Sequence, residues 1–134
     1  MAILGIGLDI VDLRRIRRIH DQHGSRFVRR YCAPGEAQAR EGDALIEHLG
    51  GLFAAKEAML KALGTGWAQG LGFRQIEVVK GPSGAPEVRL HGAAAARAEL
   101  LGVTRTHLTI THERAYAAAF AILEGDDQNS KDGS

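Results

Sequence analysis

The sequence predicts an α+β fold, a single domain with a mainly antiparallel sheet packed against a long central helix. Segments with strand-like patterning lie near both ends of the 134-residue chain, and helix-like segments lie between them. With 45% hydrophobic and 25% charged residues, the chain has the composition of one globular domain, and its length leaves no room for a second. We expect this domain to span residues 1–124, and residues 125–134 to form a polar, disordered tail.

The first predicted strand, over residues 3–11, has two unlike faces. Alternate residues build them, with Leu4, Ile6, Leu8 and Ile10 on one face and Gly5, Gly7 and Asp9 on the other. We expect the apolar face to pack and the other to be nearly bare backbone that ends in a carboxylate. The stretch is too short to span a bilayer and lacks a basic lead-in and a cleavage site, which favours a mature strand over a signal peptide.

A basic helix is predicted next, over residues 13–22, with Asp12 as its N-cap and Gly24 after its end. Seven arginines and one acid fall between residues 14 and 30. Arg14 and Arg18 lie opposite the apolar stripe and could steer an acidic partner. An ordinary solvated face and a nucleic-acid surface are the alternatives. The net charge of only +1 and the lack of aromatic residues among the arginines count against nucleic acid.

Further along, the glycines and prolines separate the remaining elements. The main helix is expected to end at Leu63, and its region starts near Glu36 with interruptions near Gly42 and around residues 50–51. A loop over residues 64–72 contains four glycines, so its amides could approach phosphates closely, although it lacks the ending of a P-loop. A plain connecting loop is the alternative. The other expected elements are strands at 73–80 and 87–90, a helix at 93–101, and an antiparallel hairpin of strands at 107–112 and 116–124.

The central helix carries charge where its surroundings predict burial. From Leu49 to Leu63 a bulky apolar arc and an alanine arc leave only Lys56, Glu57 and Lys61 as ionisable side chains. In one interpretation Glu57 and Lys61 form a helix-surface pair while Lys56 extends its ammonium to water. In the other, these side chains and the distant Asp9 line a site for a metal and an anion. Two carboxylates completed by phosphates and water are what magnesium usually takes from a protein.

Three motifs occur in order along the chain. They are Gly5-Ile6-Gly7-Leu8-Asp9-Ile10 with Arg15-Ile16 after it, then Phe53-Ala54-Ala55-Lys56-Glu57-Ala58 with Lys61-Ala62-Leu63-Gly64-Thr65-Gly66, and finally Thr109-Ile110-Thr111-His112. Together they make the chain resemble the holo-[acyl-carrier-protein] synthase family of 4'-phosphopantetheinyl transferases. The similarity runs from about residue 3 to residue 124, and the second motif is the most specific.

The resemblance implies the family's fold and a magnesium-dependent enzyme. Such an enzyme moves the 4'-phosphopantetheine of coenzyme A onto a serine of apo acyl carrier protein, releases 3',5'-ADP, and supports fatty acid biosynthesis. The resemblance implies that Asp9 and Glu57 bind magnesium and that Lys61 contacts the phosphates, with Lys56 as a second candidate. It also implies a homotrimer with active sites between subunits and an acidic carrier protein as the partner of Arg14 and Arg18. The base that deprotonates the serine is left open between Glu57 and a metal-bound water.

Further substrate contacts follow from the other motifs. We expect Gly64, Thr65 and Gly66 to approach the phosphates. The segment containing Thr109, Thr111 and His112 is expected near the nucleotide phosphate of a coenzyme A shared with the neighbouring subunit. The two threonines share the strand face opposite His112, so all three converge only if the strand end twists. The chain departs from the family in having Thr-x-Thr-His for Ser-x-Ser-His, Leu52 where arginine is common, and only Tyr31 and Glu36 of a Phe-Thr-x-x-Glu pattern.

The single cysteine, Cys32, and the low net charge bound the remaining possibilities. One cysteine forms no internal disulfide, which fits a reducing, cytoplasmic location, and the charge gives no reason to expect nucleic acid or membrane. Two other classes stay as alternatives. A non-catalytic nucleotide or coenzyme A binding module would not require both Asp9 and Glu57, and a basic nucleic-acid-binding domain would lose affinity steeply with salt.

Overall fold

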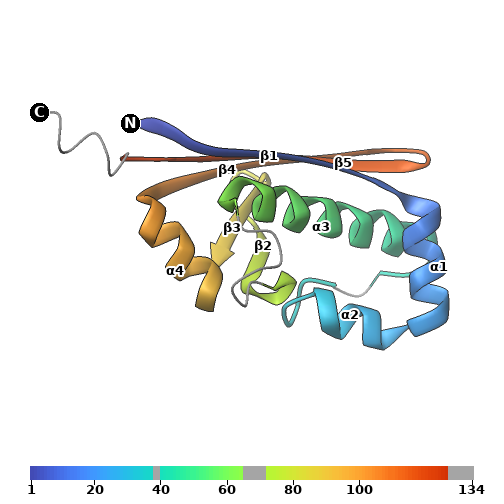
Figure 1. Cartoon of the computed structure of the whole chain (residues 1–134). Coiled ribbons are helices and arrows are strands. Elements are labelled where there is room, and N and C mark those ends of the chain that lie inside the picture. The colour runs from blue at the N-terminus through green and yellow to red at the C-terminus, as the bar shows by residue number, and fades with distance from the viewer. Residues whose placement is uncertain (38–39, 65–71, 127–134) are drawn as a thin grey trace, which may run out of the picture.

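The computed structural model describes residues 1–37, 40–64 and 72–126 of the chain. Within these ranges it confirms the predicted α+β class with an antiparallel sheet (Figure 1). The main sheet has three strands in the order β1-β5-β4, namely β1 (Ala2–Asp12), β5 (Tyr116–Gly125) and β4 (Val103–Glu113). A separate antiparallel pair joins β2 (Ile76–Lys80) to β3 (Pro86–Leu90).

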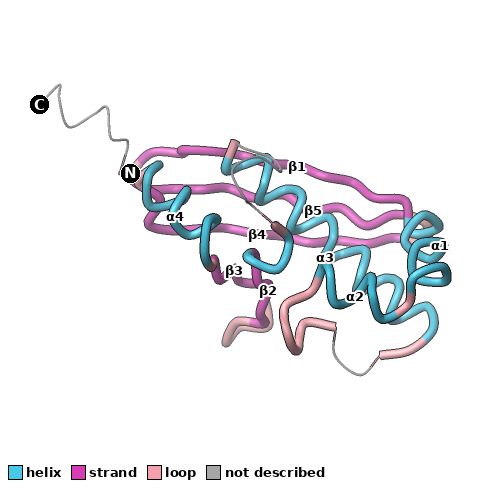
Figure 2. The backbone as a smooth tube through the Cα atoms, turned by 60° about the horizontal axis from the view of Figure 1, so that its bottom comes forward, coloured by secondary structure: helices cyan, strands magenta, loops and turns pink. Residues whose placement is uncertain are grey.

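The helices lie on one side of the three-stranded sheet, with α3 running along it and α1 and α4 near its two ends (Figures 1 and 2). Their bounds are α1 (Leu13–His23), α2 (Ser25–Tyr31), α3 (Gly42–Leu63) and α4 (Gly92–Leu101), with a short 3-10 turn, η2 (Phe73–Gln75), before β2. Among the helices in the described ranges, not one is apolar over enough of its length to span a bilayer.

Several predicted boundaries hold, and others are corrected. Asp12 caps α1 through a hydrogen bond that its side chain accepts from the amide of Arg14, as expected. The central helix, in contrast, begins only at Gly42 and continues unbroken through residues 50–51. Packing is tight there, since a Cβ at Gly50 would lie 2.3 Å from Cδ2 of the buried Leu13. Helix α2 was not predicted, since its short arginine-rich sequence shows no clear apolar period.

The packing of β1 is the reverse of the prediction. Its glycine face lies against the alanine arc of α3, where a Cβ on Gly7 would come within 1.8 Å of the carbonyl oxygen of Ala58. The bare backbone therefore allows the helix to approach the strand closely. The apolar face instead points away from α3, and Ile6, Leu8 and Ile10 are all exposed.

The core lies between the sheet and α3. It combines the alanines of β5 with the leucines, methionine and alanines of the central helix, and it extends to Ile16 of α1 and Ile76 of β2. This arrangement fixes the rotation of α3 against β1, which decides where the charged side chains of the helix lie. Of the predicted tail, residues 127–134 lie outside the described residues, and Gly125 still belongs to β5.

Candidate active site

Asp9 of β1 and Lys61 of α3 meet at the strand–helix contact that the glycines create. The ammonium of Lys61 donates to Oδ1 of Asp9 at 3.1 Å and to the backbone oxygen of Leu8 at 2.9 Å. The Lys61 side chain is 53% exposed and that of Asp9 is 16% exposed. The pair is therefore formed by residues 52 positions apart in the chain and is open to solvent.

Glu57 belongs to the same group of charges. Burial raises the pKa of its carboxyl above the ordinary value, and the negative charge of Asp9 raises it further. The positive charges of Lys61 and Arg15 act in the opposite direction. The two acids that the sequence separates by 48 positions are thus close enough for one to affect the protonation of the other, which agrees with the expectation that they come together.

The chemistry of these donors fits a divalent cation. Two carboxylates, Asp9 and Glu57, repel one another, and their negative charge is only partly offset by Lys61. In the described part of the chain no group of three or more His, Cys, Asp or Glu side chains could hold a metal by itself. Two carboxylates that leave the remaining positions to phosphate oxygens and water match the usual preference of magnesium.

Lys56 occupies a different place from the one predicted. Its side chain is completely buried, and its ammonium donates to Oε1 of Glu36 at 2.6 Å and to the backbone oxygen of Phe73 at 2.9 Å. Burial lowers its pKa, while the hydrogen bond to Glu36 opposes that change. The ammonium therefore neither extends to water nor joins Asp9 and Glu57, which corrects both interpretations of this residue.

Glu36, which matches the family's Phe-Thr-x-x-Glu pattern only in part, is bonded to several elements of the fold. Its carboxylate accepts hydrogen bonds from the backbone amides of Ala33 and Val78 as well as from Lys56. It therefore connects the segment after α2 with α3 and β2. A fully paired buried carboxylate of this kind holds elements together rather than binding a ligand. In the sequence, only the partial match to the Phe-Thr-x-x-Glu pattern, which ends at Glu36, indicated this residue.

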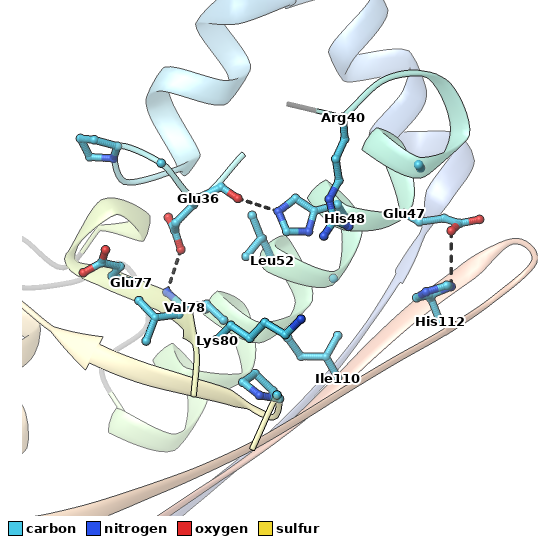
Figure 3. Close-up of a pocket in the computed structure, with 17 residues that line it drawn as sticks. Glu36, Arg40, Glu47, His48, Leu52, Glu77, Val78, Lys80, Ile110 and His112 are labelled. Carbon is cyan, nitrogen blue, oxygen red and sulfur yellow. Dashed lines mark hydrogen bonds and ion pairs between the residues drawn. The ribbon is translucent and has the colours of Figure 1, made fainter. Parts of the chain in front are cut away.

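A pocket of about 570 Å³ lies apart from this acidic site and is lined by residues of α3, β2 and β4. Figure 3 shows Arg40, Lys80 and His112 around it, with Leu52 and Ile110 as apolar lining. Leu52, the position where arginine was expected from the family, is 5% exposed and forms part of this lining. Neither Asp9 nor Glu57 nor Lys61 lines the pocket.

The predicted substrate contacts are distributed between these regions. His112 lines the pocket and lies 3.8 Å from Glu47 through Nδ1, whereas Thr109 and Thr111 are exposed and do not line it. The strand does not twist enough to bring the three together. Gly64 ends α3 in a left-handed conformation with its amide bonded to Leu60 and Lys61. Thr65 and Gly66 lie outside the described residues.

The basic helix α1 adjoins the acidic site through one arginine. Arg15, which was not among the predicted site residues, stacks over Phe53 at 5.8 Å and lies near enough to Glu57 to oppose the rise in its pKa. Arg14 and Arg18, the predicted partner contacts, are exposed, and Arg14 pairs with Asp12 at 2.8 Å. The signal in the sequence was the place of Arg15 in the first family motif, where Arg15-Ile16 follow the glycine-containing strand.

The chain as a whole matches a known family. The model of the 4'-phosphopantetheinyl transferase superfamily matches residues 5–121, which is most of the chain, and the chain belongs to this family. The match includes β1 with Asp9, all of α3, and β4 with the greater part of β5.

Individual relatives agree with the family assignment. The chain is 50% identical over 122 residues to the holo-[acyl-carrier-protein] synthase of Nitratidesulfovibrio vulgaris, covering 91% of this chain and 98% of that protein. Among solved structures it resembles the holo-[acyl-carrier-protein] synthase of Neisseria meningitidis, with a TM-score of 0.81, 36% identity, and 92% and 99% of the two chains covered. The Bacillus anthracis enzyme in complex with CoA (3',5'-ADP) gives a TM-score of 0.77 at 34% identity and covers 92% and 98%.

Proposed function

We propose that this protein transfers the 4'-phosphopantetheine of coenzyme A to a serine of apo acyl carrier protein and releases 3',5'-ADP. The single observation that carries the proposal is the grouping of Asp9, Glu57 and Lys61 at the contact of β1 with α3. It occurs in a chain that matches named holo-[acyl-carrier-protein] synthases over more than nine-tenths of its length. The product supports fatty acid biosynthesis, and the enzyme acts in the cytoplasm.

The transfer reaction requires that the negative charge on the phosphate oxygens be neutralised and that the reacting groups be positioned. The serine oxygen forms a bond to the pantetheine phosphorus, and the bond from that phosphorus to the bridging oxygen of the diphosphate breaks, so 3',5'-ADP leaves with the electron pair. The serine proton passes to Glu57 or to water. Lys61, with its ammonium exposed beside Asp9, donates to the phosphate oxygens on which charge accumulates.

Asp9 and Glu57 would hold the magnesium ion that this reaction uses. When bound, the ion supplies positive charge at the diphosphate oxygens. The donor set, two neighbouring carboxylates with one lysine, supports this assignment. Such a set binds a magnesium ion only when phosphate oxygens or water complete the coordination. Activity that disappears on chelation and returns with magnesium is the expected behaviour.

A homotrimer with sites between subunits is supported by the uncovered face of the main sheet. Apolar side chains of two adjacent strands lie in register there, and no described element covers them (Figure 1). They include Ile6, Leu8, Ile10 and Phe120, which are 59%, 62%, 67% and 38% exposed in the single chain. A patch of this kind on a small domain marks an interaction surface. Light scattering should give three times the chain mass, and Leu8→Lys should reduce both the mass and the activity.

The separation of the pocket from the acidic site supports a coenzyme A shared by two subunits. In one chain neither Asp9 nor Glu57 nor Lys61 lines the pocket, and the pocket offers Lys80 and His112 as contacts for a nucleotide phosphate. We therefore assign the nucleotide end to the pocket of one subunit and the diphosphate to the acidic site of its neighbour. Thr109 and Thr111, on the uncovered face, would then lie at the subunit contact.

The basic face of α1 is the proposed docking surface for the carrier protein, which is acidic and helical. Arg15 on the same helix lies over Phe53 and near Glu57, so it connects this face with the acidic site. Reversing Arg14 and Arg18 to glutamate should raise the KM for carrier protein and leave that for coenzyme A nearly unchanged. Equal changes in both KM values would defeat this assignment.

One assay tests the function as a whole. The protein is incubated with apo acyl carrier protein, coenzyme A and magnesium, and mass spectrometry is used to look for phosphopantetheine on the carrier serine. We expect the adduct together with stoichiometric 3',5'-ADP. Binding of coenzyme A with no adduct and no 3',5'-ADP would instead favour a non-catalytic binding module.

A further inference from the structure

Arg114, at the tip of the β4–β5 hairpin, has an unusual backbone. Its φ is 47°, and it is the one residue other than glycine with positive φ in the described part of the chain. L-residues rarely adopt this conformation, and β-hairpin turns normally place glycine or asparagine there. An arginine kept in a strained turn, where glycine would fit without strain, suggests that its side chain has a use.

The hairpin tip is fixed against the first turn of α1. The amide of Leu13 donates to the backbone oxygen of Ala115 at 2.7 Å. The side chain of Arg114 lines a small pocket of about 200 Å³ that Arg14 and Arg17 of α1 also line. An arginine from the far end of the sequence is thus added to the arginines of the basic helix.

Arg114, unlike Arg14 and Arg17 beside it in the small pocket, has no partner among the described residues. Arg14 pairs with Asp12, and Arg17 pairs with Asp43. Glu47, which also lines the small pocket, lies near His112. Over residues 1–37, 40–64 and 72–126, Arg114 forms no hydrogen bond or ion pair, and it is exposed. Its guanidinium therefore remains available to an anionic group outside the chain.

We propose that Arg114 forms one continuous cationic surface with Arg14, Arg17 and Arg18, and that this surface binds the acidic face of the carrier protein. The proposal rests on the proposed function and extends its docking surface beyond α1. Fixed arginines on two elements can contact a helical acidic partner at several points along its length.

The position of Arg114 also predicts which step it affects. Arg15 and Arg17 lie about 200° apart around α1, given 3.6 residues per turn. Arg15 lies toward Phe53 and Glu57, and Arg17 lines the pocket beside Arg114. Arg114 is therefore on the side of α1 away from the acidic site. It contacts the carrier protein far from the reacting serine and contributes to capture rather than to bond making.

The test variant is Arg114→Gly, which removes the charge and suits the positive φ. We expect the KM for apo carrier protein to rise about five-fold. The values of kcat and of the KM for coenzyme A should stay within about two-fold, and the melting temperature should be equal or higher because glycine relieves the strain. The dependence of the carrier KM on sodium chloride should also become weaker.

Arg114→Gln and Arg89→Gln form a matched pair, since Arg89 is an exposed arginine of β3 outside the cationic surface. Only the first should raise the carrier KM. If Arg14→Glu with Arg18→Glu weakens the carrier protein and the Arg114 variants do not, this inference fails while the docking on α1 stands. If neither does, the docking part of the proposed function fails too. An equal rise in the KM for coenzyme A would assign Arg114 to the nucleotide and overturn the inference.

Discussion

Lys56 and Lys61 are five positions apart on α3, and each pairs with a carboxylate, but the two pairs have opposite environments. The side chains of Lys56 and Glu36 are each 1% exposed, whereas Lys61 is 53% exposed. Glu36 is further occupied by two backbone amides. Burial, and not pairing itself, separates an ion pair that holds the fold together from one that remains open to a ligand.

We expect the largest effect on turnover from a substitution at the exposed acidic site on α3. Glu57→Gln should lower kcat at least about 1000-fold, because it removes a metal-binding carboxylate and a candidate base. Stability should not fall, since burial already disfavours the charged form of Glu57, as its raised pKa indicates. Transfer rates are measured at saturating magnesium, and the free energy of unfolding by urea titration.

Glu99→Gln on α4 serves as the control for Glu57→Gln, because Glu99 is an exposed carboxylate far from Asp9 in the fold. It should leave both rate and stability at wild-type values. Wild-type-like turnover of Glu57→Gln in saturating magnesium would contradict the role given to this residue. It would also remove the argument that the exposed site takes part in catalysis while the buried pair does not.

Lys56→Met is expected to act through stability instead. It leaves the carboxylate of Glu36 buried without its ammonium partner, and breaking a buried pair in this way costs about 3–5 kcal/mol. Urea unfolding measures the loss. The protein that remains folded should keep a kcat within about two-fold of wild type, because Lys56 does not join the acidic site.

The double variant Lys56→Met with Glu36→Gln guards against simple failure to fold. It removes both charges, and the amide oxygen can still accept from one of the backbone amides that bind Glu36. We expect its unfolding free energy to lie within about 2 kcal/mol of wild type. A specific loss of turnover in this folded double variant would show that Lys56 does contact the substrate.

The sequence predicted which charged side chains come together better than it predicted which faces are buried. Asp9, Glu57 and Lys61 were singled out because charge within an apolar helix needs a partner and because the glycine face of β1 ends in a carboxylate. The faces of β1 were inverted, because the alternation of apolar residues shows that two faces differ but not which one meets the helix. The alanine arc of α3 was correctly interpreted as a close approach, and pairing it with the glycines would have given the right orientation.

The missed features depend on contacts over long sequence distances. Glu36 reaches Lys56 and Val78, 20 and 42 positions away, so no local pattern indicates its burial. Helix α3 was expected to break around residues 50–51, since the low helix propensity of glycine suggested an interruption. Packing against Leu13 overrides that propensity. Local signals fix the caps and the hairpin, and tertiary packing decides the rest.

Lys61→Met tests the open pair from its cationic side. We expect kcat to fall about 100-fold, since one preorganised donor to the reacting phosphate is lost. The unfolding free energy should change by less than about 1 kcal/mol, because exposed ion pairs contribute little. Lys61→Arg should recover part of the rate, as it keeps the charge. A stability loss as large as that of Lys56→Met would remove the distinction between the two pairs.

The pair of Asp12 with Arg14 is more exposed than the other two pairs, with side chains 33% and 71% exposed, and should give the smallest effect. The hydrogen bonds from Arg14 lower the pKa of Asp12 to about 2. Because the folded-state pKa lies below the ordinary value of 3.8, the carboxylate stabilises the fold above that pH and loses its effect as the pH falls toward 2. Asp12→Asn should therefore melt slightly below wild type at neutral pH, and the difference should vanish near pH 2. A difference that persists at pH 2 would come from the cap geometry and not from charge.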